Sequence, residues 1–288
     1  MECLRDIDES VYLLFPMTEF TQTMLININT TLNFTGIKRV VIEHNGSKFI
    51  WVNGTQKCIP YIIAPVKIAE CDELFEYSKS KALNDILEYL SLLTVRFGTK
   101  VEMNPNTFKN YYGRMDMVLP FHDPWINRID EYIFEVDYIP VYNQSLTQEE
   151  SKMIALFRDS ITSNSIFYSI LSCFKIFEFY FSTKIDRYNW IDLNFNEAKT
   201  FAFQTNVIRG TGDWDKFLAF VNVNNMSKGD YLYKNCRCAI AHANSSPIVN
   251  PNIFSDYYEM YYSNEVIKVL AWYLILEKLD SKLHVLRT

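Results

Sequence analysis

The pattern of apolar residues changes near residue 143, and this change constrains the fold more than any other feature of the 288-residue chain. Before it, β-rich runs alternate with turn signals and one helical stretch. After it, apolar residues recur at helical spacing almost to the C-terminus. The sequence therefore predicts an α+β protein, with a mixed α/β domain at residues 1–145 and an all-α helical bundle at residues 146–288.

The first half contains one clear hairpin signal and one clear helix signal. Residues 36–55 hold two β-rich runs joined by Asn45 and Gly46, a pair typical of two-residue hairpin turns. Residues 76–96 carry apolar side chains at the spacing of an amphipathic helix.

Further strands are expected around the hairpin and the helix. Residues 58–68 are β-rich, and Pro60 and Pro65 restrict their strand to a sheet edge or place the prolines at its ends. Strand-like runs also occur at residues 100–105 and 131–142. His122 and Asp123 lie between these runs, in a segment with two prolines. Adjacent loop residues seldom face each other, so a structural loop is favoured there over an acid–base pair.

The second half begins with a capping box, in which Thr147 is the N-cap and Glu150 the N3 residue. One long, well-buried helix is expected to follow, to about residue 182. A second capping box, at Ser227 and Asp230, starts a helix that Pro247 ends. The remaining helices are predicted at residues 195–204, 214–223 and 264–280.

Composition limits the classes of protein that the chain can belong to. The net charge of −6 argues against a broad, sequence-independent nucleic-acid surface, although a small basic RNA site remains compatible with it. The six cysteines are scattered and suggest free thiols in a reducing compartment. The N-terminus is too acidic for a signal peptide, and no apolar run is long enough to span a bilayer. These features predict a cytoplasmic protein without membrane contact.

Chemistry-bearing residues concentrate in the stretch KNCRCAIAHANSSP at residues 234–247. Cys238 and His242 share a helix face, but Cys236 lies about 160° from Cys238 around an α-helix. A structural zinc site needs four ligands, and the other histidines show no matching spacing. Small core cysteines are therefore favoured over a metal site.

Arg237 and His242 are the other pair in this stretch. Five residues apart on an α-helix, they diverge by about 140°. The divergence matters less here because the helix ends just after His242, so that the long Arg side chain can curl towards it. Spacing alone also fits a solvated Arg and a His stabilised by the helix dipole.

The segment RCAIAHA resembles the Arg-Asn-x-x-x-His signature of the HEPN superfamily, in which four to six residues separate Arg from His. Its context is similar too, since the motif closes a late helix of a helical domain. Residues 167–181 resemble the first long helix of such domains, which often carries a Glu at the place of Glu178. The resemblance covers residues 147–280 and is closest to Apea-type or MauJ-like HEPN proteins.

This resemblance implies a metal-independent endoribonuclease that needs no cofactor. The RNA 2′-OH is the nucleophile, His242 the general acid or base, and Arg237 the cation that stabilises the phosphate charge. Family behaviour implies a homodimer through the helical domain, with two motifs facing one cleft. It also implies a toxin-like or antiphage-defence role, with residues 1–145 sensing a signal or docking a regulatory protein.

Other residues near the motif are candidates for supporting roles. Glu178 could hydrogen-bond Arg237 and fix its direction, or simply lie on a helix surface. The supporting polar neighbours are Asn235, Cys238 and Asn244. Additional positive charge for RNA could come from three cations that could equally be solvated surface residues: Lys228, Lys234 and Arg209.

One residue departs from the HEPN pattern. The position after the Arg is usually polar, most often Asn, but here it is Cys238, whose thiol is a weak hydrogen-bond partner. The alternative function is therefore a non-catalytic HEPN module that binds RNA or a protein partner.

Overall fold

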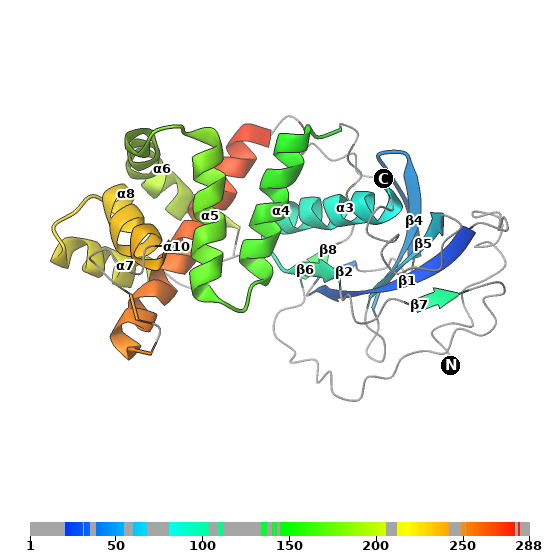
Figure 1. Ribbon diagram of the computed structural model, residues 1–288, viewed down its shortest axis with the longest axis horizontal. Coiled ribbons are helices and arrows are strands. Elements are labelled where there is room, and N and C mark those ends of the chain that lie inside the picture. The colour runs from blue at the N-terminus through cyan, green and yellow to red at the C-terminus, as the bar shows by residue number, and fades with distance from the viewer. Residues whose placement is uncertain are drawn as a thin grey trace. The chain divides into compact units, whose positions relative to one another are not determined.

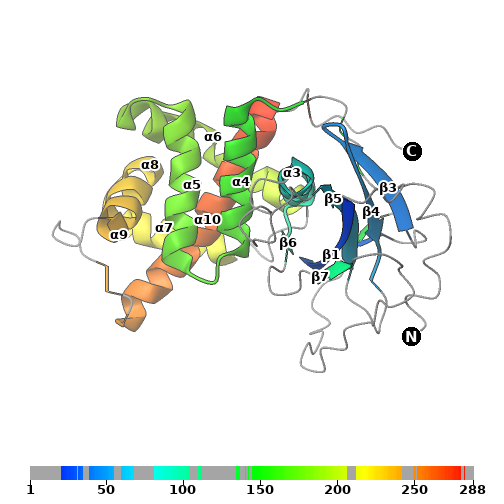
Figure 2. The same cartoon turned by 45° about the vertical axis from the view of Figure 1, so that its right-hand side comes forward.

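The computed structural model confirms an α+β protein, with a sheet in the N-terminal half and helices in the C-terminal half (Figures 1 and 2). It describes residues 21–30, 32–34, 39–54, 60–67, 81–103, 109–111, 134–136, 140, 142, 145–205, 212–241, 249–250, 252–279 and 282. Two compact units divide between Ser145 and Leu146, and the short segment Thr94–Thr99 belongs to the second unit. The division falls close to the change in apolar pattern.

The predicted hairpin is confirmed. Strands β3 (Arg39–His44) and β4 (Ser47–Val52) pair antiparallel, with His44 opposite Ser47. Asn45 and Gly46 have φ angles of 49° and 80°, which is the left-handed pair that a type I′ turn requires. This turn matches the twist of its strands and so fixes their register.

The hairpin belongs to a sheet with the strand order β3-β4-β5-β1-β6, in which β7 also pairs with β1. A separate parallel pair joins β2 and β8. The bounds of these strands are β1 Thr21–Thr30, β2 Leu32–Phe34, β5 Tyr61–Lys67, β6 Val101–Met103, β7 Lys109–Tyr111 and β8 Phe134–Val136.

The strand that carries the prolines is not an edge strand, because β5 lies between β4 and β1. The alternative, that the prolines lie at the ends of the strand, is confirmed, since Pro60 precedes β5 and Pro65 lies near its end. The described pairing of β4 covers only Tyr61–Ile63, whereas Pro65 lies opposite Thr23 of β1. The missing N–H of Pro65 therefore falls beyond the ladder with β4.

Several of the predicted helices have different bounds in the structure. The single long helix expected from Thr147 is wrong: it is two helices, which end and begin around Ser163–Ser165. The Ser165 hydroxyl accepts from the backbone N–H of Tyr168 and starts a new helix, while Ser163 is extended. The helix expected at 195–204 begins much earlier, because Thr183 caps it by accepting from Asp186 N. The helical elements are α3 Lys81–Phe97, α4 Gln148–Thr162, α5 Ile166–Tyr180, α6 Lys184–Gln204, α7 Gly212–Val223, α8 Lys228–Tyr231, η4 Leu232–Cys238, α9 Ala239–Ala241 and α10 Phe254–Leu279.

The capping box at the start of α4 is confirmed in both directions. Glu150 N donates to the Thr147 hydroxyl at 3.2 Å, and Thr147 N donates to the Glu150 carboxylate at 2.7 Å. Lys282 Nζ also donates to Glu150, at 2.6 Å. These contacts outweigh the effect of burial, which alone would raise the pKa of Glu150, and hold that pKa below its ordinary value of 4.5.

Helix α10 forms the centre of the helical unit and begins ten residues before the predicted start at 264. It crosses behind α5 in both views (Figures 1 and 2) and contacts α4, α6 and α7 as well. Its Trp272 Nε1 donates to Val95 O at 2.6 Å, and Gly98, with φ +60°, lies under the Trp272 ring. A Cβ at Gly98 would lie 2.6 Å from that ring.

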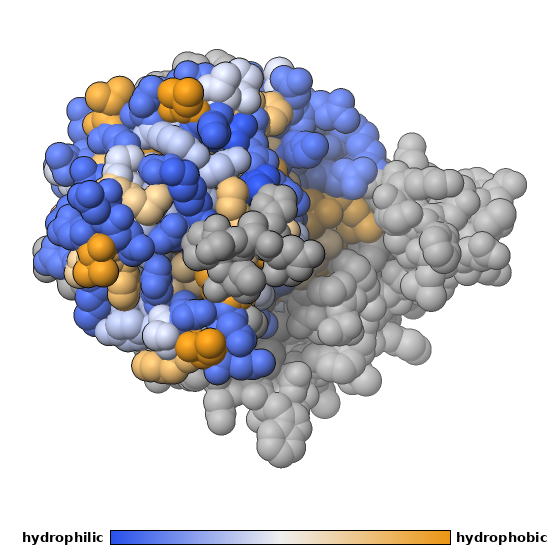
Figure 3. All heavy atoms as spheres, turned by 60° about the vertical axis from the view of Figure 1, so that its left-hand side comes forward, coloured by the Kyte–Doolittle hydropathy of each residue, from blue (hydrophilic) through white to orange (hydrophobic). Residues whose placement is uncertain are grey.

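One face of the helical unit is mixed rather than broadly apolar (Figure 3). On the face drawn in Figure 3, hydrophobic residues form separate spots among hydrophilic ones. None of the helices in the described part of the chain is both long and apolar enough to cross a membrane.

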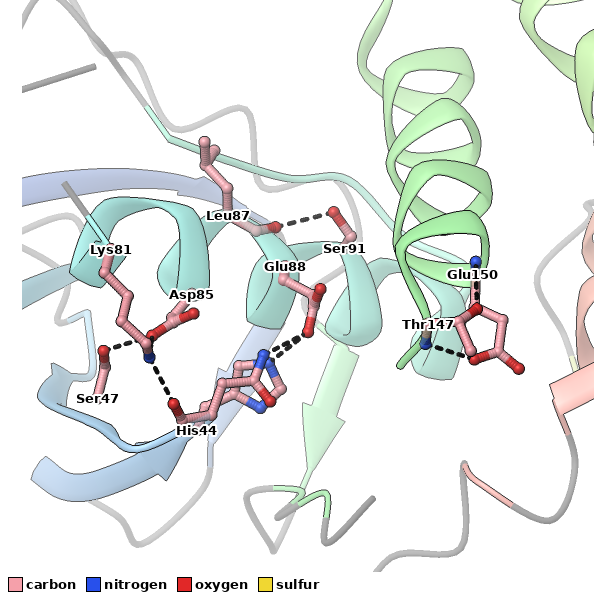
Figure 4. Close-up of polar contacts among 10 residues, drawn as sticks. His44, Ser47, Lys81, Asp85, Leu87, Glu88, Ser91, Thr147 and Glu150 are labelled. Carbon is pink, nitrogen blue, oxygen red and sulfur yellow. Dashed lines mark hydrogen bonds and ion pairs between the residues drawn. The ribbon is translucent and has the colours of Figure 1, made fainter. Parts of the chain in front are cut away.

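In the N-terminal unit, polar side chains of α3 tie the hairpin turn to the helix (Figure 4). Glu88 of α3 accepts from Asn45 Nδ2 at 2.7 Å and lies 3.1 Å from His44 Nε2. Asp85 pairs with Lys81 at 2.6 Å and accepts from the Ser47 hydroxyl. We call this set the turn cluster: His44, Asn45, Ser47, Lys81, Asp85 and Glu88.

Candidate functional site

Arg237 lies on a continuous helix made of α8, η4 and α9, which we call the motif helix. This helix is π-helical from Leu232 to Cys238. At its start, the Tyr231 hydroxyl donates to Glu259 of α10. Further along, the Cys236 thiol is buried near Ser263 of α10, whose hydroxyl acts to lower the pKa of that thiol. The step from Tyr231 to Cys236 is five residues long, whereas the facing step on α10, from Glu259 to Ser263, is four residues long. A π-helical segment, with its i→i+5 hydrogen bonds, accommodates such an extra residue.

The π-helix also changes the geometry that the sequence suggested for the motif. The divergence of about 140° assumed an α-helix throughout, but Arg237 lies within the wider turn. π-Helical turns are rare and are frequent at functional sites. The π-helical segment is therefore consistent with a functional site on this helix.

Gly229 holds the start of the motif helix against α6. A Cβ added there would lie 2.6 Å from both Cα and O of Tyr188, so no other residue allows this approach without displacement. The backbone N–H of Gly229 donates to Asp192 Oδ1 at 3.0 Å. This close packing brings the first turns of α6 beside the motif helix.

The central contact of the site joins Arg237 to Glu178 of α5. Arg237 donates from Nε and Nη2 to the same oxygen, Glu178 Oε1, at 3.1 and 2.9 Å. Arg187 of α6 places its Nη1 3.7 Å from that oxygen. Three helical elements thus converge on one carboxylate oxygen, and we call this set the arginine–glutamate cluster: Glu178, Arg187 and Arg237.

The cluster is half-buried rather than sealed. Side-chain exposures are 24% for Arg237, 30% for Glu178 and 12% for Arg187. Burial alone would lower the pKa of Arg237, but the charge of Glu178 and its hydrogen bonds raise it above its ordinary value. Arg237 is therefore a permanent cation whose direction is fixed by two hydrogen bonds.

Aromatic rings pack beside the guanidinium of Arg237. The Tyr233 ring lies one helical turn earlier, with its centroid 5.7 Å from Arg237 Cζ. Tyr188 and Phe174 contact Tyr233 edge-on, at centroid distances of 5.2 and 6.4 Å. Among the described residues the buried Tyr188 hydroxyl has no hydrogen-bond partner, and burial raises its pKa to about 12. These rings restrict the side chain of Arg237 in addition to its contact with Glu178.

The cysteines of this unit fall into two environments. Cys173 and Cys236 are fully buried, and burial raises their pKa values to about 11 and about 12. Both thiols thus stay protonated, as small core residues do. Cys238 is half-buried beside Arg237. Within the ranges described above, no three His, Cys, Asp or Glu side chains gather in a way that could hold a metal ion.

The structure brings together two of the predicted site residues, Arg237 and Glu178, and the predicted contact between them is present. Lys234 is exposed and pairs with Asp230 at 2.9 Å, while Lys228 lies 5.1 Å from the Phe195 ring. Asn235 is half-buried on η4. The remaining candidates lie outside the described residues: His242, Asn244, Arg209, His122 and Asp123.

Sequence reasoning did not find the other members of the site. Arg187 and Tyr188 lie on α6, whose first turns were not predicted as helix, and their distance from the motif along the chain hides their contact with it. Gly229 lies inside the predicted capping box, where a glycine is an available signal of close backbone approach.

The fold and the cluster define a helical domain in which a late helix presents a fixed arginine. A model of the family described as methylamine utilization protein MauJ matches residues 153–276. The matched region contains α5, α6 and the motif helix, and therefore all three residues of the arginine–glutamate cluster. The matched region lies within residues 147–280, over which the sequence resembles MauJ-like proteins. The family match supports that resemblance independently. No curated protein and no solved structure matches the chain.

Proposed function

We propose that the protein is a metal-independent endoribonuclease of the HEPN type. The observation that carries the proposal is the arginine that Glu178 holds in one direction at a half-exposed site. A guanidinium fixed in this way can donate to phosphate oxygens without reorganising as charge develops. The motif Arg-x4-His supplies His242 five residues later in the sequence.

The proposed reaction is an internal transesterification of RNA. The 2′-oxygen attacks phosphorus, and the bond between phosphorus and the 5′-oxygen of the next nucleotide breaks. One proton leaves the 2′-OH and one reaches the 5′-oxygen, so the products are a 2′,3′-cyclic phosphate and a 5′-hydroxyl. His242 performs one of these two transfers, and Arg237 stabilises the charge on the non-bridging oxygens.

The assembly and setting that we propose rest on the same resemblance. A homodimer through the helical domain would supply a second His242 for the other proton transfer. The N-terminal unit would sense a signal or dock a regulatory partner, because an unregulated ribonuclease harms its own cell. A cytoplasmic toxin or antiphage-defence effector fits this combination.

A second candidate function is a non-catalytic HEPN module that binds RNA or a protein partner. Cys238, half-buried beside Arg237, favours it because a thiol orients a neighbouring group poorly. Replacing Cys238 by Asn distinguishes the two functions. If the parent is inert and Cys238→Asn cuts RNA, the site is a decayed nuclease.

The test is cleavage of single-stranded RNA by the purified protein in the presence of a chelator. We expect cleavage by the wild type and by Lys152→Ala, an exposed charge control on α4. Arg237→Ala and His242→Ala should abolish cleavage while the helical circular dichroism stays unchanged. Equal cleavage by these two variants and the wild type would show that the proposed site is wrong.

A further inference from the structure

We infer that Arg187 is a second phosphate-binding residue, which contacts the RNA phosphate next to the one that Arg237 holds. This inference rests on the proposed function and extends its site from the motif helix to α6. Neither the motif nor the family match assigns a role to this residue.

The donors of Arg187 are divided between structural contacts and the site. Its Nε donates to Phe181 O at 3.0 Å and its Nη2 to Ser182 O at 3.2 Å. These bonds fix the guanidinium plane at the corner between α5 and α6. The third nitrogen, Nη1, points to Glu178 Oε1, but at 3.7 Å the contact is longer than a hydrogen bond. Nη1 thus faces the cluster without a close hydrogen bond to Glu178.

The formal charges of the three residues in the cluster do not cancel. Glu178 supplies one negative charge to two guanidiniums, so the cluster carries a net charge of +1. Among the described residues, two acidic side chains on these helical elements have other partners, since Asp186 accepts from Thr183 and Asp230 pairs with Lys234. A half-buried site with surplus positive charge favours an anionic ligand.

The geometry places the two arginines close enough to bind the same strand. Arg237 Nη2 and Arg187 Nη1 lie 2.9 and 3.7 Å from the same carboxylate oxygen. Two cations this near each other cannot serve phosphates that are far apart along a chain. Both arginines bind phosphate if Arg237 contacts the scissile phosphate and Arg187 contacts its immediate neighbour. This arrangement would fix the direction of the RNA across the motif.

The experiment measures binding and cutting separately. A fluorescent 2′-O-methyl oligouridine keeps the phosphates but lacks the nucleophile, so its affinity can be measured across salt concentrations without cleavage. The slope of log affinity against log salt is negative, and loss of one phosphate contact lowers its magnitude by about 0.7 for a single strand. We expect this decrease in Arg187→Gln, together with a roughly 10-fold higher KM for RNA and a kcat within about 2-fold of the wild type.

Two further variants separate phosphate binding from a structural role. Lys199→Gln removes a cation further along α6, about 18 Å from Arg187, and should leave the slope unchanged. Arg187→Lys loses the bonds to Phe181 and Ser182 but keeps the positive charge. Because the salt dependence follows the charge, the slope of this variant should return to the wild-type value. If Arg187 only caps the corner, both Arg187 variants lose thermal stability and the slope stays constant, and the inference is overturned. A wild type that neither binds nor cuts RNA overturns the proposed function as well.

Discussion

The turn cluster and the arginine–glutamate cluster both centre on helix carboxylates, but they differ in burial and in charge. In the turn cluster His44 is 3% and Glu88 15% exposed, and the contacts tie a hairpin to α3 within one unit. In the arginine–glutamate cluster Arg237 and Glu178 are 24% and 30% exposed, and two cations share one carboxylate. The centre of the first cluster, His44 and Glu88, is nearly buried although Lys81 at its margin is exposed, whereas the second cluster is half-exposed and its three residues carry a net positive charge.

This difference separates groups that stabilise the fold from groups that can bind a ligand. A nearly buried polar pair contributes to the stability of the fold, because removal of one partner leaves the other buried without its hydrogen bond. A half-exposed cation contributes little to stability but keeps its attraction for anions. Substitutions in the turn cluster should therefore change stability alone, and substitutions in the arginine–glutamate cluster should change activity with little loss of stability.

The largest expected effect is that of His44→Ala. The substitution leaves the Glu88 carboxylate without its imidazole partner and opens a small cavity beside Tyr89, so we expect a loss of about 3 kcal/mol. Hydrogen exchange of the α3 amides measures this loss locally. The control is Lys48→Ala, which removes an exposed ion pair and should cost at most about 0.5 kcal/mol. Equal exchange rates in the two variants would contradict a structural role for the turn cluster.

Next in size is the effect of Glu178→Gln on cleavage. The neutral amide no longer fixes Arg237, and we expect kcat to fall about 100-fold, as misplacement of a catalytic group by about 1 Å can cause. The melting temperature should change little, because both side chains are partly exposed. Glu149→Gln, at an exposed position of α4, is the matched control. A Glu178→Gln variant as active as this control would show that Glu178 does not position Arg237.

Gly229→Ala links the packing of the helical unit to its site. The new methyl group would meet the backbone of Tyr188, so we expect a loss of about 2 kcal/mol through overpacking. Because the motif helix would move away from α6, the effect of this variant on cutting should exceed that of Asn222→Ala, an exposed control on α7. Unfolding in urea measures the stability, and a variant with wild-type stability would show that the close approach is unnecessary.

The smallest effect, about 1 kcal/mol, belongs to the cap of α4. The pKa of Glu150 is lowered in the folded protein, so its contribution is present above the unfolded value of 4.5 and is lost as pH falls through the folded value. Glu150→Gln should therefore be less stable than the wild type at pH 7, and the difference should vanish in acid. A difference independent of pH between 7 and 3 would contradict this account of the cap.

Local signals in the sequence predicted the elements that local chemistry determines. Asn45 and Gly46 specify a turn by their own backbone preferences, and Thr147 and Glu150 satisfy each other across one helical turn. The break at Ser163–Ser165 was missed because its apolar surroundings continue the helical pattern. Local capping by Ser165 overrides that pattern in the structure.

The motif predicted Arg237, and the resemblance suggested its contact with Glu178, but the rest of the site depends on tertiary packing. The π-helical segment packs on α10, with Tyr231 at Glu259 and Cys236 near Ser263, and no single segment of the sequence reveals this contact. The motif helix lies beside α6 because Gly229 allows a close approach to the backbone of Tyr188, the residue after Arg187. Contacts of this kind join residues that are tens of positions apart, and periodicity within one segment does not report them.

The most direct test of the central claim is the chemistry of the ends that the protein leaves on RNA. With a chelator present, the wild type should convert a single-stranded RNA into fragments that carry a 2′,3′-cyclic phosphate and a 5′-hydroxyl, and Arg237→Ala should leave the RNA intact. Fragments with a 5′-phosphate, or the same cyclic ends at the same rate from Arg237→Ala, would contradict the claim that the fixed arginine serves an internal transesterification.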